Sequence, residues 1–388
     1  MIVDLHAHYP MHLDSAVRGN LWRLLRTRRG QLRIRDYFRG IAVHIASQFF
    51  NYRRPFAGPR IDLPKLNAGG VGVAYSVLYS FFDEADCAPP EPGEYAAELV
   101  RLAGAVAASL VDDAVVARNP AELTAATGKL ALVHCVEGGF HLGRTPDDVR
   151  AAVDTLADAG VAYITLAHLC FRGIATNANA LPFLGDAQYA AVCRQRADVG
   201  LTKAGHAAIE QMLERKVLID VSHMSEQALA DTWAKLDRED PHRRVPVLAT
   251  HGAFRFGEQH YNLSRDTVER IVERDGVIGL IFAQHQIWDG LEDRHPQWLY
   301  RLREHRAGTF AKLERHIEAI AEVSHDYRHV GIGSDFDGFI KPTLKGLRDM
   351  ASVARLEEWL VERYEDDAEL ICSENALRPL RTYWGGAP

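Results

Sequence analysis

Eight short apolar segments, separated by longer stretches with helical periodicity, constrain the fold of this chain more than any other feature. They are rich in β-branched side chains and lie at residues 2–5, 72–79, 130–136, 162–166, 217–221, 245–249, 276–281 and 330–333. Their apolar residues run almost continuously instead of alternating, which indicates strands buried on both faces, as in a parallel sheet. Eight alternating strand and helix units predict an α/β fold, a closed (β/α)8 TIM barrel with helices outside the ring of strands.

The segments between these strands carry the signals that begin and end helices. Thr145 supplies a capping hydroxyl and is followed by Pro146 at the first helical position and by acidic residues in the first turn. Gly160 ends this helix just before the fourth strand. Thr202 and Ser264 precede two further segments of the same design. We therefore expect helices after strands three, four and six.

Two connections are longer than a strand-to-helix connection requires, at roughly residues 10–65 and 282–306. We expect both to be insertions over the mouth of the barrel, after strands one and seven. Neither an internal repeat nor a low-complexity linker divides the 388 residues, and barrels with insertions reach this length as one unit. The sequence predicts a single domain over residues 1–388.

Charge and cysteine content narrow the possible functions. A net charge of −7 argues against a nucleic-acid partner, which would need a basic stripe. No segment reaches the roughly 18 uncharged apolar residues of a membrane span, and Met1 is not followed by a signal-peptide pattern. Five cysteines without a Cys-x-x-Cys pair are typical of reduced thiols, not of a disulfide framework or a zinc ribbon. We expect a cytoplasmic protein that binds neither nucleic acid nor membranes.

Six of the eight predicted strands end in residues that can bind metals or move protons. These residues are His6 and His8 after strand one, Glu137 after strand three, His168 after strand four, His223 after strand five, His251 after strand six and Asp335 after strand eight. Chemistry in such barrels takes place at the carboxyl ends of the strands, so these side chains are expected to converge. A single histidine at a strand end is usually explained by packing, but six such ends favour a functional site.

The types and spacing of these residues favour a two-metal site. His6 and His8 are two residues apart, hence on the same side of a strand, where both can bind one ion. The two oxygens of Glu137 can bridge a pair of ions about 3.5–4 Å apart, and His223 and His251 would complete the second ion. Nitrogen and oxygen ligands fit catalytic zinc, with manganese, iron and cobalt as alternatives. We expect two zinc ions per chain, which would activate a shared water.

Other residues near the strand ends are candidates for proton transfer and support. Asp335 is the expected catalytic shuttle that carries a proton from the water to the leaving group. His168 is expected to hydrogen-bond the substrate oxygen on which negative charge develops. Asp337 is expected to order the loop after Asp335, with the shuttle role as its alternative. Asp220 is expected to support a metal ligand through hydrogen bonds, and Tyr79 either packs in the core or lines the site.

Four sequence blocks resemble those of one enzyme family. The blocks are Glu137-Gly138-Gly139, Tyr163-Ile164-Thr165-Leu166-Ala167-His168, Ile219-Asp220-Val221-Ser222-His223 and Gly333-Ser334-Asp335-Phe336-Asp337-Gly338. Their order and spacing resemble those of the membrane (renal) dipeptidase family of the amidohydrolase superfamily. The resemblance extends from His6 to about Arg378 and therefore covers most of the chain.

The resemblance implies a function and assigns roles to individual residues. It implies hydrolysis of a dipeptide or a dipeptide-like amide, with His168 and Asp335 serving substrate binding and proton transfer. By this resemblance the ligands of one zinc ion are His6, residue 8 and Glu137, and those of the other are Glu137, His223 and His251. Members of the family are often dimers, so the resemblance also implies a homodimer.

Three positions depart from the family pattern. The first strand reads His6-Ala7-His8 where the family has His-x-Asp, which removes one negative charge but keeps a metal ligand. Tyr261 stands where the family has an arginine that binds the substrate carboxylate, and Arg255 or Arg265 are the alternatives for that role. The late signature Gly-Gly-Asn-x-x-Arg reads Ser373-Glu374-Asn375-Ala376-Leu377-Arg378. We expect the fold and the metal chemistry to persist and substrate recognition, by His168, Tyr261 and Arg255, to differ.

The sequence therefore favours a zinc-dependent dipeptidase with a small, dipeptide-like substrate. Two alternatives remain at this point. The chain could hydrolyse another small amide, a lactone or an ester, because the carboxylate contact is altered. It could also be a non-catalytic metal-binding relative, although retention of every expected ligand together with Asp335 favours an enzyme.

Overall fold

Parallel strands occupy all eight segments that the sequence predicts. The computed structural model describes residues 1–11, 13, 45, 49, 51–52, 57–80, 83–84, 90–110, 114–181, 184–291, 306–340 and 342–385. Its strands are β1 (Ile2–Ala7), β2 (Val71–Leu78), β3 (Ala114–Ala117), β4 (Leu130–Glu137), β5 (Tyr163–Thr165), β6 (Leu218–Asp220), β7 (Val247–Gly252), β8 (Val277–Leu280) and β9 (Val330–Ile332). Among the strands of the described residues, β3 alone lies outside the predicted set.

The sheet closes because β2 pairs with β4 as well as with β1. The order β2-β1-β9-β8-β7-β6-β5-β4 then returns to β2, and the predicted TIM barrel is confirmed. The additional strand β3 pairs with residues 130–133 of β4, whereas β5 pairs with residues 136–137 of the same strand. Three of the four residues of β3 are only half-buried, so this short strand lacks the sequence pattern of the barrel strands.

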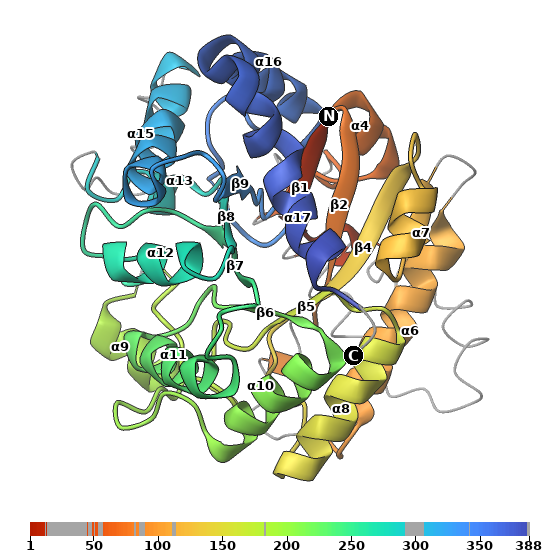
Figure 1. Ribbon diagram of the computed structural model, residues 1–388, viewed down its shortest axis with the longest axis vertical. Helices are drawn as coiled ribbons and strands as arrows, with labels where there is room; N and C mark the ends of the chain where they lie inside the picture. Colours follow the sequence, from red (N-terminus) through yellow and green to blue (C-terminus); the bar gives the residue numbers. More distant parts are fainter. Residues whose placement is uncertain are drawn as a thin grey trace.

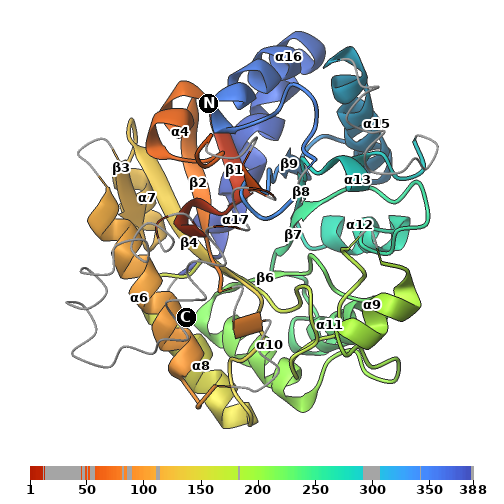
Figure 2. The ribbon, with the colours of Figure 1, turned by 180° about the vertical axis from the view of Figure 1, so that it is seen from behind.

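Helices surround the barrel in the two opposite views of Figures 1 and 2. They are α4 (Leu63–Ala68), α6 (Glu94–Ser109), α7 (Pro120–Ala125), α8 (Pro146–Asp158), α9 (Asp186–Val192), α10 (Lys203–Arg215), α11 (Glu226–Glu239), α12 (Arg265–Val272), α13 (Gln284–Ile287), α15 (Arg306–Ser324), α16 (Ala354–Tyr364) and α17 (Asn375–Thr382). Three helical turns, η2 (Met350–Val353), η3 (Glu365–Asp367) and η4 (Leu370–Glu374), flank α16. None of the helices in the described ranges is long and apolar enough to cross a membrane.

The predicted helix starts at Thr145, Thr202 and Ser264 are confirmed. In each case the side-chain hydroxyl accepts a hydrogen bond from the backbone N–H three residues later. At Thr145 the carboxylate of Asp148 also accepts the N–H of the capping residue, which completes a capping box. These bonds satisfy backbone donors that the first helical turn leaves unpaired.

The two expected insertions are described only in part. Of residues 10–65, the structure describes short pieces and the beginning of α4, and the rest lies outside the described residues. In the segment 282–306 the chain forms α13, and residues 292–305 lie outside the described residues. The helix α15 follows and packs against α12 and α13.

The C-terminal segment covers the end of the barrel at which the strands begin. There η4 and α17 contact β1 and β9, and α17 lies in front of the strands in Figure 1. The side chain of Asn375 donates to the carbonyl of Val330, the first residue of β9, at 2.7 Å. Arg378 donates to the carbonyl of Gly276, just before β8, at 3.1 Å. The Asn-x-x-Arg part of the late signature therefore binds the N-terminal ends of β8 and β9. This is the end of the barrel opposite to the carboxyl ends of the strands.

Candidate metal centre

Side chains from the ends of six barrel strands meet in one place. His6 lies in β1 and His8 follows it, Glu137 ends β4, His168 follows β5, His223 follows β6, His251 lies in β7 and Asp335 follows β9. All seven are buried, with at most 7% of their surface exposed. The convergence follows from the fold, because the carboxyl ends of parallel strands lie at the same end of a barrel.

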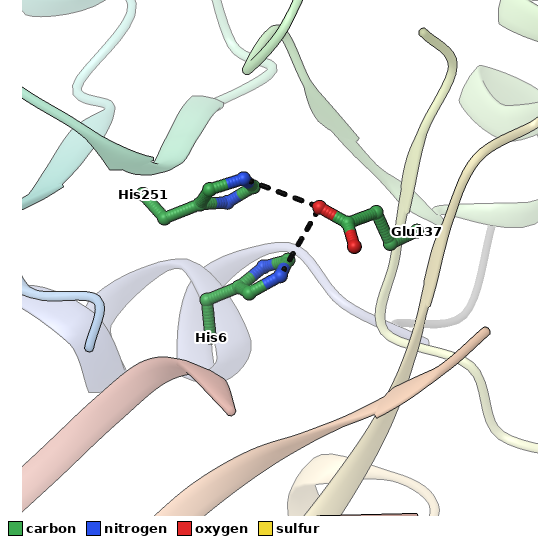
Figure 3. Close-up of side chains that lie close together, drawn as sticks. All are labelled: His6, Glu137 and His251. Carbon is green, nitrogen blue, oxygen red and sulfur yellow. Dashed lines mark ion pairs between the residues drawn. The ribbon is translucent and has the colours of Figure 1, made fainter. Parts of the chain in front are cut away.

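Glu137 lies at the centre of this cluster. The distances from its Oε1 are 3.3 Å to His6 Nε2, 3.2 Å to His251 Nε2 and 3.4 Å to His223 Nε2, and those from its Oε2 are 3.2 Å to His8 Nε2 and 3.3 Å to His168 Nε2. Figure 3 shows His6 and His251 directed at the same carboxylate oxygen. A carboxylate with imidazoles on each of its two oxygens can join two groups of metal ligands.

Thr250 determines which nitrogen carries the proton in two of these histidines. The carboxylate of Asp220 accepts the Thr250 hydroxyl at 2.7 Å and the Thr250 backbone N–H at 3.0 Å. Since a hydroxyl has one proton, its oxygen must accept from Nδ1 of His6 and from Nδ1 of His251, both at 3.0 Å. With the proton on Nδ1, Nε2 of each ring presents a lone pair to Glu137.

Tyr163 supports the same proton assignment for His6. Its hydroxyl donates to the carbonyl of Leu5 at 3.0 Å and must therefore accept the Nδ1 proton of His6, at 2.8 Å. A lone pair on Nε2 that faces a carboxylate oxygen repels it unless a cation lies between them. An imidazole that donates through one nitrogen and leaves the other free is also the usual state of a metal ligand.

Burial and neighbouring charges set the protonation of the cluster. Burial lowers the pKa of His6 to about 3 and that of His223 to about 4, so both rings are neutral. Burial also opposes charge on His8 and His168, but the carboxylates beside them outweigh it and raise their pKa values to about 10 and about 9. Burial opposes ionisation of Glu137, yet the surrounding histidines hold its pKa well below the ordinary value. His251 also has a raised pKa, because its contact with Glu137 outweighs burial. The cluster thus combines an ionised carboxylate with neutral rings at His6 and His223, and a divalent cation would displace the protons that the other rings favour.

The possible ligand atoms fall into three overlapping groups. Within each group all atoms lie within 4.8 Å of one another, and the groups are His6 with Glu137 and His251, His6 with His8 and Asp335, and Glu137 with His168 and His223. Within the described part of the chain, the buried atoms His6 Nε2 and Asp335 Oδ1 make no hydrogen bond. The residues present therefore fit bound cations. Asp335 and His168 lie as close to the other ligand atoms as the five expected ligands do.

Unusual backbone conformations direct two of these side chains. His223 has a φ of 65° and Asp335 a φ of 55°, a left-handed region that costs a residue other than glycine on the order of 1–3 kcal/mol. Gly338 packs so closely on Asp335 that a Cβ there would lie 1.8 Å from Asp335 Oδ1. Asp337 accepts the backbone N–H of Arg60 at 2.9 Å, which connects the loop after Asp335 to residue 60. Its role in ordering that loop stays a prediction. Backbone strain of this kind is typical of functional positions.

Glu84 and Thr250 are residues of the site that the sequence did not reveal. Glu84 is 2% exposed, and its carboxylate accepts hydrogen bonds from His168 Nδ1 at 2.6 Å and from the Tyr79 hydroxyl at 2.8 Å. The Tyr79 ring stands edge-on to His168, with centroids 4.8 Å apart, so Tyr79 lies beside the site. One glutamate after β2, outside any periodic pattern, carries no signal that sequence reasoning could use.

Tyr261, at the position expected to hold arginine, packs directly against the cluster. Its ring stands edge-on to His223 with centroids 4.9 Å apart, and its hydroxyl donates to the carbonyl of His251 at 3.1 Å. Tyr261 therefore fills this position with an aromatic ring and no charge. Its contact with substrate stays a prediction.

The two alternative arginines bind elsewhere. Arg255 donates to the carbonyl of Asn262 at 2.8 Å and pairs with Glu226 at 2.8 Å. Arg265 pairs with Glu269 at 3.2 Å on the exposed face of α12. Both guanidinium groups thus have partners outside the cluster. The substrate-binding role expected of Arg255 stays a prediction, and its contacts favour a structural one.

Comparisons with known proteins place the chain among dipeptidases. A family model described as membrane dipeptidase (peptidase family M19) matches residues 1–383. An uncharacterized dipeptidase of Schizosaccharomyces pombe is 27% identical over 399 residues, which cover 98% of this chain and 79% of that protein. A second uncharacterized dipeptidase of that yeast is 29% identical over 250 residues, 64% of this chain and 52% of that protein.

Two solved structures share the fold over 99% of both chains. One is a dipeptidase described as a metallopeptidase of family M19, with 20% identity and a TM-score of 0.66. The other is a metallopeptidase from Rhodobacter sphaeroides, liganded with a phosphinate mimic of the dipeptide L-Ala-D-Ala, with 19% identity and a TM-score of 0.70.

We predict that Thr250→Val weakens metal binding. The substitution keeps the shape of the side chain but removes the oxygen that accepts the Nδ1 protons of His6 and His251. Loss of such a supporting contact typically lowers metal affinity about 10- to 100-fold. Calorimetric titration of zinc into chelator-treated protein measures the effect.

The control is Thr309→Val, which changes an equally buried threonine of α15 whose hydroxyl donates to the carbonyl of Lys345. Its zinc affinity should equal that of the unchanged protein, and Thr250→Ser should recover most of the loss. Unchanged affinity in Thr250→Val would contradict the assignment of the two ring protons.

Proposed function

Because this chain belongs to the membrane dipeptidase family, peptidase family M19, we propose that it is a dipeptidase that acts with two zinc ions. The observation that carries the proposal is the position of Glu137, whose two oxygens face five imidazole nitrogens at 3.2–3.4 Å. The proposed ligands of one ion are His6, His8 and Glu137, and those of the other are Glu137, His223 and His251. Bound ions would supply an activated water and a Lewis acid for the scissile carbonyl.

Asp335 is the proposed proton carrier. It is buried, and its Oδ1 lies 3.2 Å from His8 Nε2 and 3.9 Å from His6 Nε2. A carboxylate in this place can take the proton that the attacking water loses and pass it to the departing amine. The left-handed backbone of Asp335 and the close packing of Gly338 hold the carboxylate in this position.

His168 is the proposed partner of the substrate oxygen. Its Nδ1 is held by Glu84 and its Nε2 lies 3.3 Å from Glu137 Oε2, so that Nε2 is the end directed at the ligand cluster. A proton on Nε2 can be donated to the carbonyl oxygen of the amide as negative charge develops there.

The proposed substrates have a neutral, amidated or aromatic group at the end where related enzymes bind a carboxylate. Tyr261 offers an aromatic face at this position, where arginine would offer two charged donors. Loss of such a contact costs about 1.5–3 kcal/mol for a free carboxylate. The same observation favours the second candidate function, hydrolysis of another small amide, a lactone or an ester.

A substrate panel tests the function and the substrate class together. It contains free dipeptides, including L-Ala-D-Ala, because a protein of the same fold holds a mimic of that dipeptide, and also their C-terminal amides, lactones and esters. We expect hydrolysis of dipeptide-like amides, with a higher kcat/KM for the amidated forms. A preference for free dipeptides with kcat/KM of about 10⁴ M⁻¹s⁻¹ or more would contradict the role of Tyr261. Hydrolysis of lactones or esters alone would contradict the proposal that the chain is a dipeptidase.

We predict that Asp335→Asn lowers kcat by about 10²–10⁴-fold, because asparagine cannot accept and release the proton. Metal content, measured by elemental analysis, should stay nearly unchanged. The control is Asp366→Asn, an exposed aspartate of η3, which should keep full activity. If Asp335→Asn kept its rate while Asp337→Asn lost it, the shuttle would be Asp337.

A further inference from the structure

Glu84 is a buried carboxylate whose contacts satisfy both of its oxygens. Its Oε2 lies 2.6 Å from His168 Nδ1 and 2.8 Å from the Tyr79 hydroxyl, and its Oε1 accepts the backbone N–H of Cys170 at 2.7 Å. A carboxylate is costly to bury unless it is paired and hydrogen-bonded in this way. Three donors from two places in the chain, Tyr79 after β2 and His168 with Cys170 after β5, are therefore arranged around this one side chain.

The contact with Glu84 decides how the His168 ring is oriented. An ionised carboxylate only accepts hydrogen bonds, so Nδ1 of His168 must carry a proton. The opposite ring nitrogen, Nε2, then points to Glu137 Oε2, 3.3 Å away. The rings of Tyr79 and His223 stand edge-on to His168, with centroids 4.8 Å and 4.7 Å away. The ring is thus fixed at one nitrogen and packed between two neighbours.

Glu84 also joins two connections at the carboxyl end of the barrel. Its own backbone carbonyl accepts a hydrogen bond from Arg172 Nε at 2.9 Å, and Cys170 and Arg172 both follow β5. Glu84 could therefore have a merely structural role, in which it stabilises the loop after β5. An experiment must distinguish this role from an effect on His168.

We propose that Glu84 is a positioning residue, which holds the proton of His168 on Nδ1 and directs Nε2 at the amide oxygen of a substrate bound beside Glu137. The proposal rests on the proposed function. Glu84 does not touch the substrate and acts through the imidazole. The negative charge of Glu84 stabilises the His168 ring while Nε2–H donates to the developing oxyanion. Glutamine has the same shape as glutamate but lacks this charge.

The first test is the kinetic effect of Glu84→Gln in the zinc-loaded enzyme. We expect kcat to fall about 10- to 100-fold, with KM within about threefold of the unchanged enzyme because substrate binding itself is not the target. Metal content should not change. The control is Glu98→Gln, a half-buried glutamate of α6 that pairs with Arg101 on the outside of the barrel, and it should keep full activity. Unchanged kcat in Glu84→Gln would overturn the proposal.

A double-mutant cycle separates positioning from a structural role. In the background of His168→Gln, the added Glu84→Gln should change kcat by less than about twofold, because the residue through which Glu84 acts is gone. If Glu84→Gln lowered kcat by the same factor in both backgrounds, Glu84 would act through the loop after β5, and the proposal would be wrong.

A spectroscopic readout is independent of activity. In protein labelled with ¹⁵N-histidine, the signals of His168 are those that His168→Gln removes. We expect a protonated Nδ1 in the zinc-loaded enzyme and a weakened or lost Nδ1 proton in Glu84→Gln. An unprotonated Nδ1 in the unchanged enzyme would overturn the proposal whatever the activity. If no substrate is hydrolysed, the proposed function fails, while the spectrum still decides whether Glu84 sets the His168 proton.

Discussion

The structure depends on one buried negative charge, that of Glu137, and on the imidazoles that face it. The residue is 1% exposed, and an ionised carboxylate in such surroundings is stable only if positive charge or hydrogen-bond donors are close. Yet hydrogen bonds fix the protons of His6 and His251 on the far side of each ring. A neutral His6 or His251 ring therefore gives no proton to Oε1, which is faced in addition by His223 Nε2 at 3.4 Å. The histidines whose pKa values are raised, His8 and His168, face the other oxygen, Oε2. Cations bound as in the proposed function would balance the charge at both oxygens.

Two further buried carboxylates, Asp220 and Asp4, stabilise the strand ends that carry these residues. Asp220 accepts the hydroxyls of Thr165 and Thr250 at 2.6 and 2.7 Å and so connects β5, β6 and β7. Asp4 accepts the backbone N–H groups of His6 and Ser334 at 3.1 and 2.9 Å and so connects β1 to the loop that carries Asp335. Each carboxylate fixes the strand ends that present the cluster, and the barrel thereby supplies a rigid base for it.

Features that depend on local pattern were predictable from the sequence, and features that depend on tertiary pairing were not. The barrel strands are buried on both faces, so their positions, and with them the convergence of His6, Glu137 and His251, follow from apolar runs. The strand β3 is short and half-buried, so it shows no such run. Thr250 could not be assigned a role, because its importance comes from ring nitrogens on two strands. Glu84 likewise gains its importance only from the contact with His168, which lies 84 residues away in the chain.

The most direct test of the account is a crystal structure of zinc-saturated protein, with anomalous diffraction data collected at the zinc absorption edge. Two anomalous peaks per chain are expected, one on each side of the Glu137 carboxylate and about 3.5–4 Å apart. A single peak, or peaks that Glu137 does not contact, would contradict the claim that this carboxylate joins two metal ions.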